Sequence, residues 1–360
     1  MQETGFNIAE HGHRRYNPLL DQWILVSPHR IDRPWAGQVE PNCEPFPELD
    51  PLNPLLPGAI RGGGIKNPDY ESVYVFTNDF PAMKPDFPAP AYSPDPLFTM
   101  SLARGTCKVI CYSPKSNTTI GIMSIQDIFN IINVWINELV QLGEKFEWVQ
   151  IFENKGEIMG CSNPHPHGQI WACNFLPTIP YTKNKCQKKY FEKYGRPMLM
   201  DYARKEIEKQ ERIVVLNDDW VVLVPFWASW PYETMILPRT HIRRMYDLNH
   251  DQKISLADIL RKINIKYDNL FKTIFPFSMG WHGAPTGKYK AEKMDHWVFH
   301  GIFYPPLLRS ATVKKFMVGF EMLAETQRDI TPERAAELLR EQSDTHFVLT
   351  QSQETDKPKP

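Results

Sequence analysis

The chain has 360 residues, of which 42% are hydrophobic and 23% charged, and its formal net charge at pH 7 is −1. This composition is typical of a globular protein with a sizeable core. The balanced charge argues against a nucleic-acid or membrane partner, for which a basic excess is expected. The sequence has no apolar run of about 18 residues and no signal-peptide core near its start. We therefore expect a cytoplasmic protein.

The first half of the chain starts irregularly. Residues 41–96 are crowded with proline, which cannot continue a helix or a central strand. We expect irregular chain here, broken by a strand at 73–76. A second strand at 108–112 and a helix over 125–142 follow, with Ser124 as the helix cap. A strand at 148–153, a histidine-bearing loop and a strand around Ile170 complete this unit.

The second half repeats this order of elements. Strands are predicted at 220–227 and 233–238, and a helix over 251–271 shows apolar residues at helical spacing. Strand-like segments at 277–283 and 296–301 follow, and both carry histidines. The repeat predicts an α+β fold in which two duplicated histidine-triad-like units form a largely antiparallel sheet flanked by helices.

The predicted domains follow this repeat. The N-terminal unit takes residues 1–180 with the histidine loop, the C-terminal unit takes 181–350, and the polar tail 351–360 is expected to be disordered. Outside the repeat, we expect helical structure over 188–212, 312–328 and 332–339. Thr331 and Pro332 are typical of the start of the last of these helices.

The most specific segment of the chain is residues 160–169, which read GCSNPHPHGQ. His165 and His167 at i and i+2 point to the same side of an extended segment. Neutral imidazole is a nucleophile at cellular pH and forms a phosphorus bond that is reactive enough to pass the group onward. Backbone N–H groups of Gly160, Cys161 and Ser162 could surround phosphate oxygens. The same histidine spacing also occurs in metal sites, so a metal-binding or purely structural role is the alternative.

These residues resemble the active site of the galactose-1-phosphate uridylyltransferases, a branch of the histidine-triad superfamily. The resemblance covers nearly the whole chain and includes further motifs, at residues 13–19, 23–30, 33–35, 76–80, 152–156, 278–283, 304–313 and 315–319. It implies a reversible ping-pong exchange of UMP between UDP-glucose and galactose 1-phosphate. His167 would carry UMP as a uridylyl-histidine, His165 would support the loop, and Gln169 would bind the transferred phosphoryl oxygens. Glutamine has no proton to lose, which suits transfer between phosphates better than hydrolysis.

The resemblance also implies the substrate-binding residues and a homodimer with shared active sites. The residues that resemble the nucleotide and phosphate sites are Asn78, Asp79, Asn154, Gly160, Cys161, Ser162, Arg30 and Arg33. Those that resemble the sugar-phosphate site are Lys315, Phe316, Val318, Phe320, Glu321 and Gln327, with Phe320 standing where many members have tyrosine.

The family often binds zinc or iron at two sites, and both have lost ligands here. Of the first set, only His165 remains, because Asn53, Leu56 and Ser116 stand near the other ligand positions. Of the second, His282 and His300 remain, Ile302 replaces a histidine, and the glutamate position falls near Lys183. His296 is the available substitute. The sequence therefore predicts a metal content well below one ion per site, and possibly no cofactor.

Two other functions stay open on the sequence alone. One is a different nucleotidyltransferase of the histidine-triad group, such as a dinucleoside polyphosphate phosphorylase. The other is a relative that binds UDP-sugars without turning them over. A donor screen for UMP or AMP labelling separates these from an active uridylyltransferase.

Overall fold

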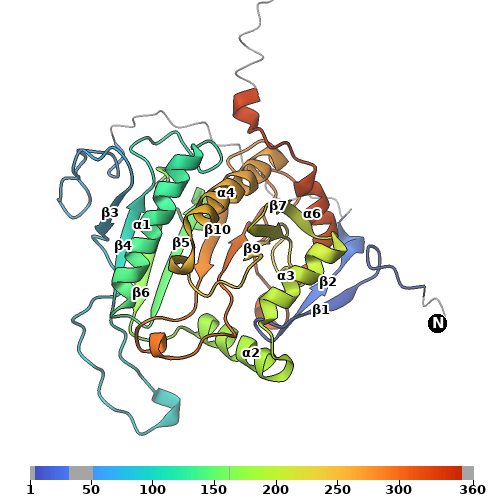
Figure 1. Ribbon diagram of the computed structural model, residues 1–360, viewed down its shortest axis with the longest axis horizontal. Helices are drawn as coiled ribbons and strands as arrows, with labels where there is room; N and C mark the ends of the chain where they lie inside the picture. The colour runs from blue at the N-terminus through green and yellow to red at the C-terminus, as the bar shows by residue number, and fades with distance from the viewer. Residues whose placement is uncertain (1–4, 32–51, 162, 351–360) are drawn as a thin grey trace, which may run out of the picture.

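The computed structural model describes residues 5–31, 52–161 and 163–350. Its centre is a nine-stranded antiparallel sheet with the order β3-β4-β6-β5-β10-β11-β9-β8-β7 (Figure 1). The first half of the chain supplies β3 (Tyr74–Thr77), β4 (Gly105–Cys111), β5 (Trp148–Lys155) and β6 (His167–Cys173). The second half supplies β7 (Ile213–Leu216), β8 (Trp220–Leu223), β9 (Thr234–Pro238), β10 (Phe277–His282) and β11 (His300–Tyr304).

The predicted repeat is visible as an internal symmetry of this sheet. In the first half, β3 and β4 precede helix α1 (Ile125–Gly143), and β5 and β6 follow it. In the second half, β8 and β9 precede helix α4 (His250–Phe271), and β10 and β11 follow it. The strand order from the centre outward is the same in both halves, and β5 pairs with β10 where the halves meet. This confirms the predicted α+β class, whereas the domain division stays a prediction because one sheet runs through both halves.

Helices α1 and α4 cover one face of the sheet. Apolar side chains of α1, such as Ile132 and Trp135, and of α4, such as Leu260, pack on Ile151 and Ile236 of the strands. Ser124 caps α1 through a reciprocal pair of hydrogen bonds with Asp127, as predicted. The local helix signals therefore placed both long helices correctly.

Two further helices cover the opposite face, but only over the second half. These are α2 (Thr178–Tyr194) and α3 (Met198–Lys209), of which α3 packs Leu199 on Val221 and Leu237. The predicted helical segment 188–212 is thus two helices, and the first begins ten residues earlier than 188. None of the described helices covers the same face of β6 and β5, and their side chains are partly accessible there.

A small sheet joins the two ends of the described chain. It consists of β1 (His13–Asn17), β2 (Gln22–Val26) and β12 (Gln327–Arg328), with β12 parallel to β2. Helix α6 (Pro332–Arg340) follows and starts at the predicted cap Thr331.

Two predictions in the second half were wrong. Residues 312–328 contain only the short helix α5 (Phe320–Leu323) and β12, because Gly319 adopts a positive φ of 56° and the chain then pairs with β2. The strand predicted at 296–301 begins only at His300, because Trp297 donates its backbone N–H to Met294 in a turn. The predicted strand at 73–76 is confirmed as β3, and the tail 351–360 lies outside the described residues.

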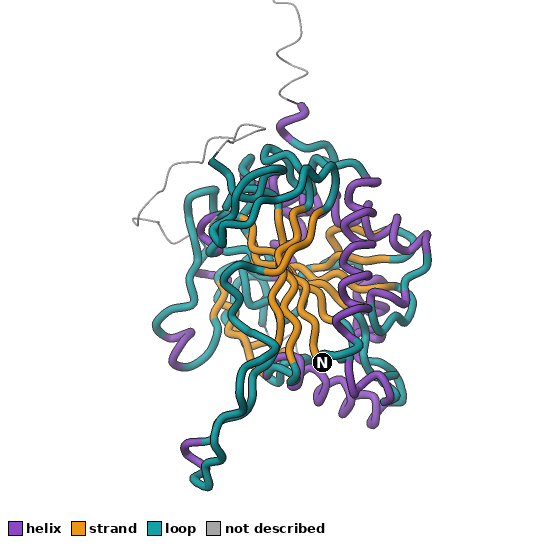
Figure 2. Tube along the Cα trace, turned by 90° about the vertical axis from the view of Figure 1, so that its left-hand side faces the viewer, coloured by secondary structure: helices purple, strands orange, loops and turns teal. Residues whose placement is uncertain are grey.

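A long excursion between β3 and β4 projects from the body of the protein (Figure 2). We call residues 84–104 the arm. Hydrogen bonds from Gly105 N to Lys84 O and from Arg104 Nε to Phe87 O close its base. None of the helices in the described ranges is long and apolar enough to cross a membrane.

Candidate active site

The uncovered face of the sheet carries a row of partly buried side chains from β6, β5 and β10. Along β6, His167, Gln169 and Trp171 face this side, while Ile170 and Ala172 are buried under α1 on the other. Gln169 lies opposite Phe152 of β5, and Asn154 lies opposite Ser278 of β10. The strand register therefore gathers three of the predicted site residues, His167, Gln169 and Asn154, on one accessible surface.

His167 is held by a backbone hydrogen bond. Its Nδ1 lies 2.7 Å from the carbonyl oxygen of His165, so Nδ1 carries the proton and Nε2 has the free electron pair. Among the described residues, Nε2 has no hydrogen-bond partner. Burial lowers the pKa of His167, which keeps the imidazole neutral at cellular pH. The ring is thus oriented and in the nucleophilic form.

His165 is anchored from both ring nitrogens. Nδ1 lies 3.0 Å from Asn53 Nδ2 and 3.1 Å from Ser116 Oγ, and Nε2 lies 2.8 Å from the carbonyl oxygen of Ser113. Asn163 adds a bond from its Nδ2 to Asn53 Oδ1 at 2.9 Å. Burial lowers the pKa of His165 to about 4, which keeps it neutral. Amide and hydroxyl groups thus surround His165, and because neither is a usual zinc ligand, these residues do not fit a metal ion.

Gly168 lets a neighbouring aromatic ring approach the active-site strand. A Cβ on Gly168 would overlap the Tyr112 hydroxyl and would lie 3.0 Å from the carbonyl oxygen of Phe152. Only glycine fits here without displacing Tyr112. The residue following the nucleophile candidate is therefore determined by packing on the buried side of the strand.

The side-chain amides of Gln169 and Asn154 are each held through a hydrogen bond to the amide oxygen. Gln169 Oε1 accepts a hydrogen bond from Trp171 Nε1 at 3.0 Å, and Asn154 Oδ1 accepts one from Ser278 Oγ at 2.7 Å. Both acceptor oxygens are therefore occupied. The remaining donors suit the oxygens of a phosphate or of a uracil ring.

The glycine-rich turn before the loop differs in part from the prediction. Gly160 adopts a positive φ of 77°, as a turn of this kind requires, but its N–H donates to Glu157 O at 2.9 Å. The Gly160 N–H is therefore already hydrogen-bonded within the protein and does not face a ligand. Cys161 is partly buried, and burial raises the pKa of its thiol, so it stays protonated. Ser162 lies outside the described residues.

Asn78 and Asp79 follow β3 and are joined to a residue that the sequence did not indicate. Asn78 Oδ1 accepts from Phe80 N at 2.9 Å, and Asp79 pairs with Arg61 at 3.5 Å. Arg61 is buried over the Phe76 ring, and its Nε and Nη1 have no hydrogen-bond partner in the described structure. Arg61 stands in a proline-rich stretch without periodicity, so no local signal marked it.

The predicted sugar-phosphate residues form a separate network. Lys315 pairs with Glu321 at 2.7 Å, and Glu321 accepts from Gln327 N at 3.2 Å. Gln327 Nε2 donates to Asp329 at 2.7 Å, and Asp329 pairs with Arg30 at 3.3 Å. Phe316, Val318 and Phe320 stand exposed beside this network. Arg33 lies outside the described residues. No hydrogen bond or ion pair within the described ranges joins this network to the His167 loop.

A lysine side chain contacts His282 and His300, the histidines of the second half of the chain. His282 of β10 and His300 of β11 are directly opposite each other, and their rings stack with centroids 5.2 Å apart. Lys183 Nζ of α2 lies 3.0 Å from His300 Nε2 and 3.3 Å from His282 Nδ1. His296 is turned away and contacts Asn184 Oδ1 at 2.6 Å. Two imidazoles and an amine do not fit a zinc or iron ion, and the described residues contain no group of three or more His, Cys, Asp or Glu placed to hold a metal.

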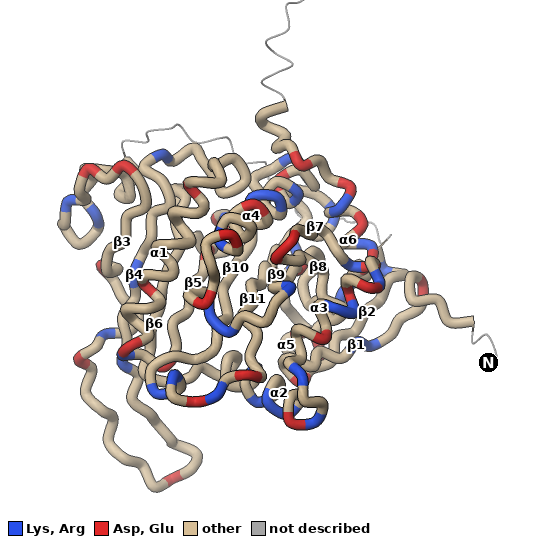
Figure 3. The backbone as a smooth tube through the Cα atoms, viewed as in Figure 1, with Lys and Arg blue, Asp and Glu red and all other residues tan. Residues whose placement is uncertain are grey.

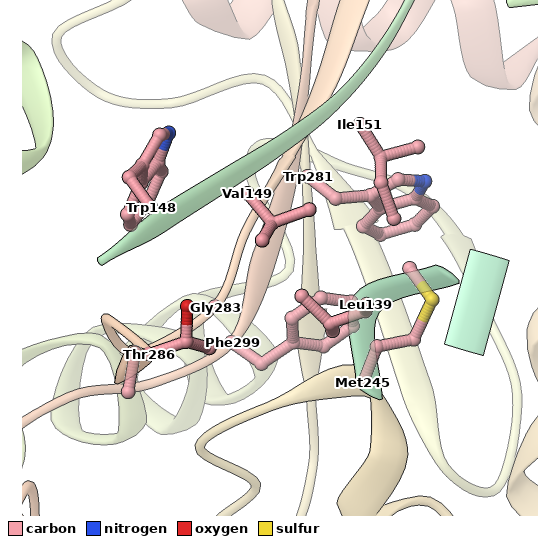
Figure 4. A pocket seen from close by; sticks show the side chains of 10 residues that line it. Leu139, Trp148, Val149, Ile151, Met245, Trp281, Gly283, Thr286 and Phe299 are labelled. Atoms are coloured by element: carbon pink, nitrogen blue, oxygen red, sulfur yellow. The ribbon is translucent and has the colours of Figure 1, made fainter. Parts of the chain in front are cut away.

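An internal pocket lies between α1, the sheet and the loop after β10 (Figure 4). Leu139, Val149, Ile151, Trp281 and Phe299 line it, and none of its lining residues is ionisable. It therefore offers no charged side chain to a nucleotide phosphate, and the accessible face with His167 is the better candidate site.

The fold occurs in enzymes of known structure. A solved uridylyltransferase matches 92% of this chain and 97% of its own chain, with a TM-score of 0.72 and 21% identity. An ADP-glucose phosphorylase from Arabidopsis thaliana also matches 92% of this chain and all of its own, with a TM-score of 0.72 and 20% identity. At these identities the likeness establishes the fold.

Sequence comparisons identify the family. The model of the galactose-1-phosphate uridyl transferase N-terminal domain matches residues 4–177, and that of the C-terminal domain matches residues 183–351. The galactose-1-phosphate uridylyltransferase of Rattus norvegicus is 52% identical over 96% of this chain and 92% of its own. The enzyme of that name from Haemophilus influenzae is 54% identical over 95% of this chain and 97% of its own. The chain belongs to the galactose-1-phosphate uridylyltransferase family and is a transferase, as the sequence motifs predicted.

Proposed function

We propose that this protein transfers UMP between UDP-glucose and galactose 1-phosphate through a uridylyl group on His167. The observation that carries the proposal is the orientation of His167. Its Nδ1 donates to the carbonyl oxygen of His165 at 2.7 Å, and its Nε2 faces the accessible side of the sheet beside Gln169. Full-length similarity to relatives that are named for this activity supports the choice of substrates.

In the first half-reaction, Nε2 of His167 attacks the α-phosphorus of UDP-glucose. A P–N bond forms, the P–O bond to the β-phosphate breaks, and glucose 1-phosphate leaves with that electron pair. Positive charge develops on the imidazole, and the carbonyl of His165 stabilises it through Nδ1–H. In this proposal the Gln169 amide donates to a phosphoryl oxygen. Galactose 1-phosphate then attacks the same phosphorus, breaks the P–N bond and gives UDP-galactose.

The test is a single-turnover experiment in which the protein is labelled by UDP-glucose that carries an isotope in its uridine. We expect one acid-labile UMP per chain on His167, released by galactose 1-phosphate as UDP-galactose. His167→Ala should take no label, and His241→Ala is a matched control because His241 is a histidine outside the site that contacts the carbonyl of Trp297. Equal labelling by ADP-glucose, or label retained in His167→Ala, would contradict the proposal.

We further propose a homodimer in which each active site takes its sugar-phosphate residues from the partner. The network of Lys315, Glu321 and Gln327 is complete in itself but has no polar contact with the His167 loop of the same described chain. The arm exposes Tyr92, Leu97 and Phe98, which are at least two-thirds exposed, and it carries few charges (Figure 3). Exposed apolar side chains on a projecting segment are typical of an interface.

Complementation tests the shared site. His167→Ala and Lys315→Ala homodimers should both be inactive, whereas a mixed dimer should regain activity because one of its two sites has both residues intact. Light scattering gives the mass of the particle, with Leu97→Asp and Phe98→Asp as interface variants. A monomer that is fully active, or mixed dimers without activity, would rule out sharing.

We also propose a cytoplasmic location, since the five described cysteines are all free thiols, as is typical of a reducing compartment.

A further inference from the structure

Lys183 occupies an unusual position for a lysine. Its side chain is 1% exposed, and α2 places it against β10 and β11 in the covered half of the sheet. Its amine contacts His300 Nε2 at 3.0 Å and His282 Nδ1 at 3.3 Å. Both distances are those of hydrogen bonds and exceed the about 2.0–2.1 Å of a zinc–imidazole bond.

The hydrogen bonds of His300 determine which of its atoms is donor and which is acceptor. His300 Nδ1 lies 2.8 Å from the carbonyl oxygen of Val298 and donates to it. Its Nε2 is therefore an acceptor and points at the lysine. A metal-bound histidine has the same arrangement, with one nitrogen toward the cation and the other donating to a carbonyl. Here the amine stands where the cation of such a site would be.

We propose that the amine of Lys183 replaces a metal ion between His282 and His300, so that hydrogen bonds from this side chain fasten α2 to the sheet without metal. With either two or three hydrogens, the amine has an N–H for each imidazole. Within the described part of the chain no third ligand competes for the position, since Ile302 is apolar and His296 contacts Asn184. Burial lowers the pKa of Lys183 to about 7, and the buried carboxyl of Glu233, which accepts from Ser229 and Trp230, opposes this shift.

A second polar contact from the same helix supports a fastening role. Gln187, one turn after Lys183, is fully buried, and its Oε1 accepts from Val298 N at 3.3 Å. Lys183 and Gln187 thus bind the start of β11 from two successive turns of α2. This junction is buried and polar, and it adds to the apolar contacts that Cys186 and Tyr190 of α2 make on the same side of the sheet.

The first test uses the unmodified protein. Purified enzyme should contain far less than one zinc or iron per chain by mass spectrometry, and its melting temperature should be unchanged by a chelator or by added zinc. Copurification with one ion per chain, whose removal lowers the melting temperature, would overturn the proposal.

Variants of Lys183 test the fastening directly. Lys183→Met keeps the length of the side chain without the amine, so it should melt several degrees lower, and zinc should not restore it. Lys183→Glu supplies a carboxylate beside two imidazoles, so it should gain zinc binding and a zinc-dependent rise in melting temperature. Lys185→Glu makes the same charge change at an exposed position of α2 and should show neither effect. A Lys183→Met protein as stable as the wild type, or a Lys183→Glu protein that folds but ignores zinc, would refute the replacement.

Discussion

His300 repeats the backbone hydrogen bond of His167. Each ring bonds through Nδ1 to the carbonyl oxygen two residues earlier, at 2.7 Å in His167 and 2.8 Å in His300. Each histidine is the first residue of an equivalent strand, β6 or β11, and each is followed by glycine. The two histidines therefore occupy corresponding positions in the repeat, but of the two only His167 has an Nε2 without a hydrogen-bond partner among the described residues.

This asymmetry predicts where the covalent intermediate forms. His300 is fully buried and its Nε2 accepts from Lys183, so it cannot reach a substrate phosphorus. Peptide mapping of enzyme trapped with UDP-glucose should find UMP on His167 and none on His300. The same result is expected for Lys183→Met, because removing the amine does not expose the ring. A uridylyl group on His300 in either protein would show that our assignment of the two sites is wrong.

Asn53 should affect the nucleophile through His165. The side chain contacts Ser116, His165 and Asn163, so Asn53→Ala leaves several buried polar groups without partners. We expect a loss of about 2–3 kcal/mol in the free energy of unfolding and a fall of roughly tenfold or more in the labelling rate, since a displaced nucleophile reacts slowly.

The control for Asn53 is Asn264→Ala in α4. Asn264 is equally buried, and its Nδ2 bonds Leu260 O far along the sequence from the loop. It should lose stability in urea unfolding but label at the wild-type rate. Equal loss of labelling in both variants would mean that Asn53 acts only through overall stability.

Gly168→Ala should damage both stability and labelling. The added methyl overlaps the Tyr112 hydroxyl, and overpacking of this kind costs about 1–3 kcal/mol. Tyr112→Phe removes the overlapping oxygen, so the double variant should recover part of the melting temperature and of the labelling rate. The recovery of stability and labelling should be incomplete, because the added methyl would still lie 3.0 Å from the carbonyl oxygen of Phe152. No recovery at all would show that the Tyr112 contact does not determine the need for glycine.

Glu153 should make stability depend on pH. It is buried on β5, and burial raises its pKa to about 7, against the opposing effects of Lys155 and Tyr112. The native state thus holds a proton that the unfolded state releases above about pH 4.5, so the stabilising protonated form is lost as pH rises through 7.

Glu153→Gln removes this titration and keeps the shape of the side chain. Between pH 5 and pH 8 it should gain stability relative to the wild type, by at most roughly 3 kcal/mol for a shift of this size. Urea unfolding at both pH values measures the gain. Glu157→Gln, at an exposed position nearby, should show no such change. A wild-type stability that rises with pH relative to Glu153→Gln would reverse the sign and disprove the assignment.

The sequence predicted the elements whose signals are local. Helices α1, α4 and α6 have capping residues and apolar spacing, and all three form close to the expected residues. The segment 312–328 was wrongly predicted as one helix, because its last residues bond to β2, which lies about three hundred residues earlier. Propensity carries no information about such a distant partner.

The sequence by itself determined the family, the repeat and the histidine loop, since the signal for each lies in short segments of neighbouring residues. Only the tertiary structure decided what surrounds those histidines. Asn53 meets His165 across 112 positions, Lys183 meets His300 across 117, and Arg61 pairs with Asp79. These contacts follow from the order of strands in the sheet and from the helices that pack on it. The physical reason is that hydrogen bonds and burial act between groups that are close in space, and no local periodicity encodes which distant segments become neighbours.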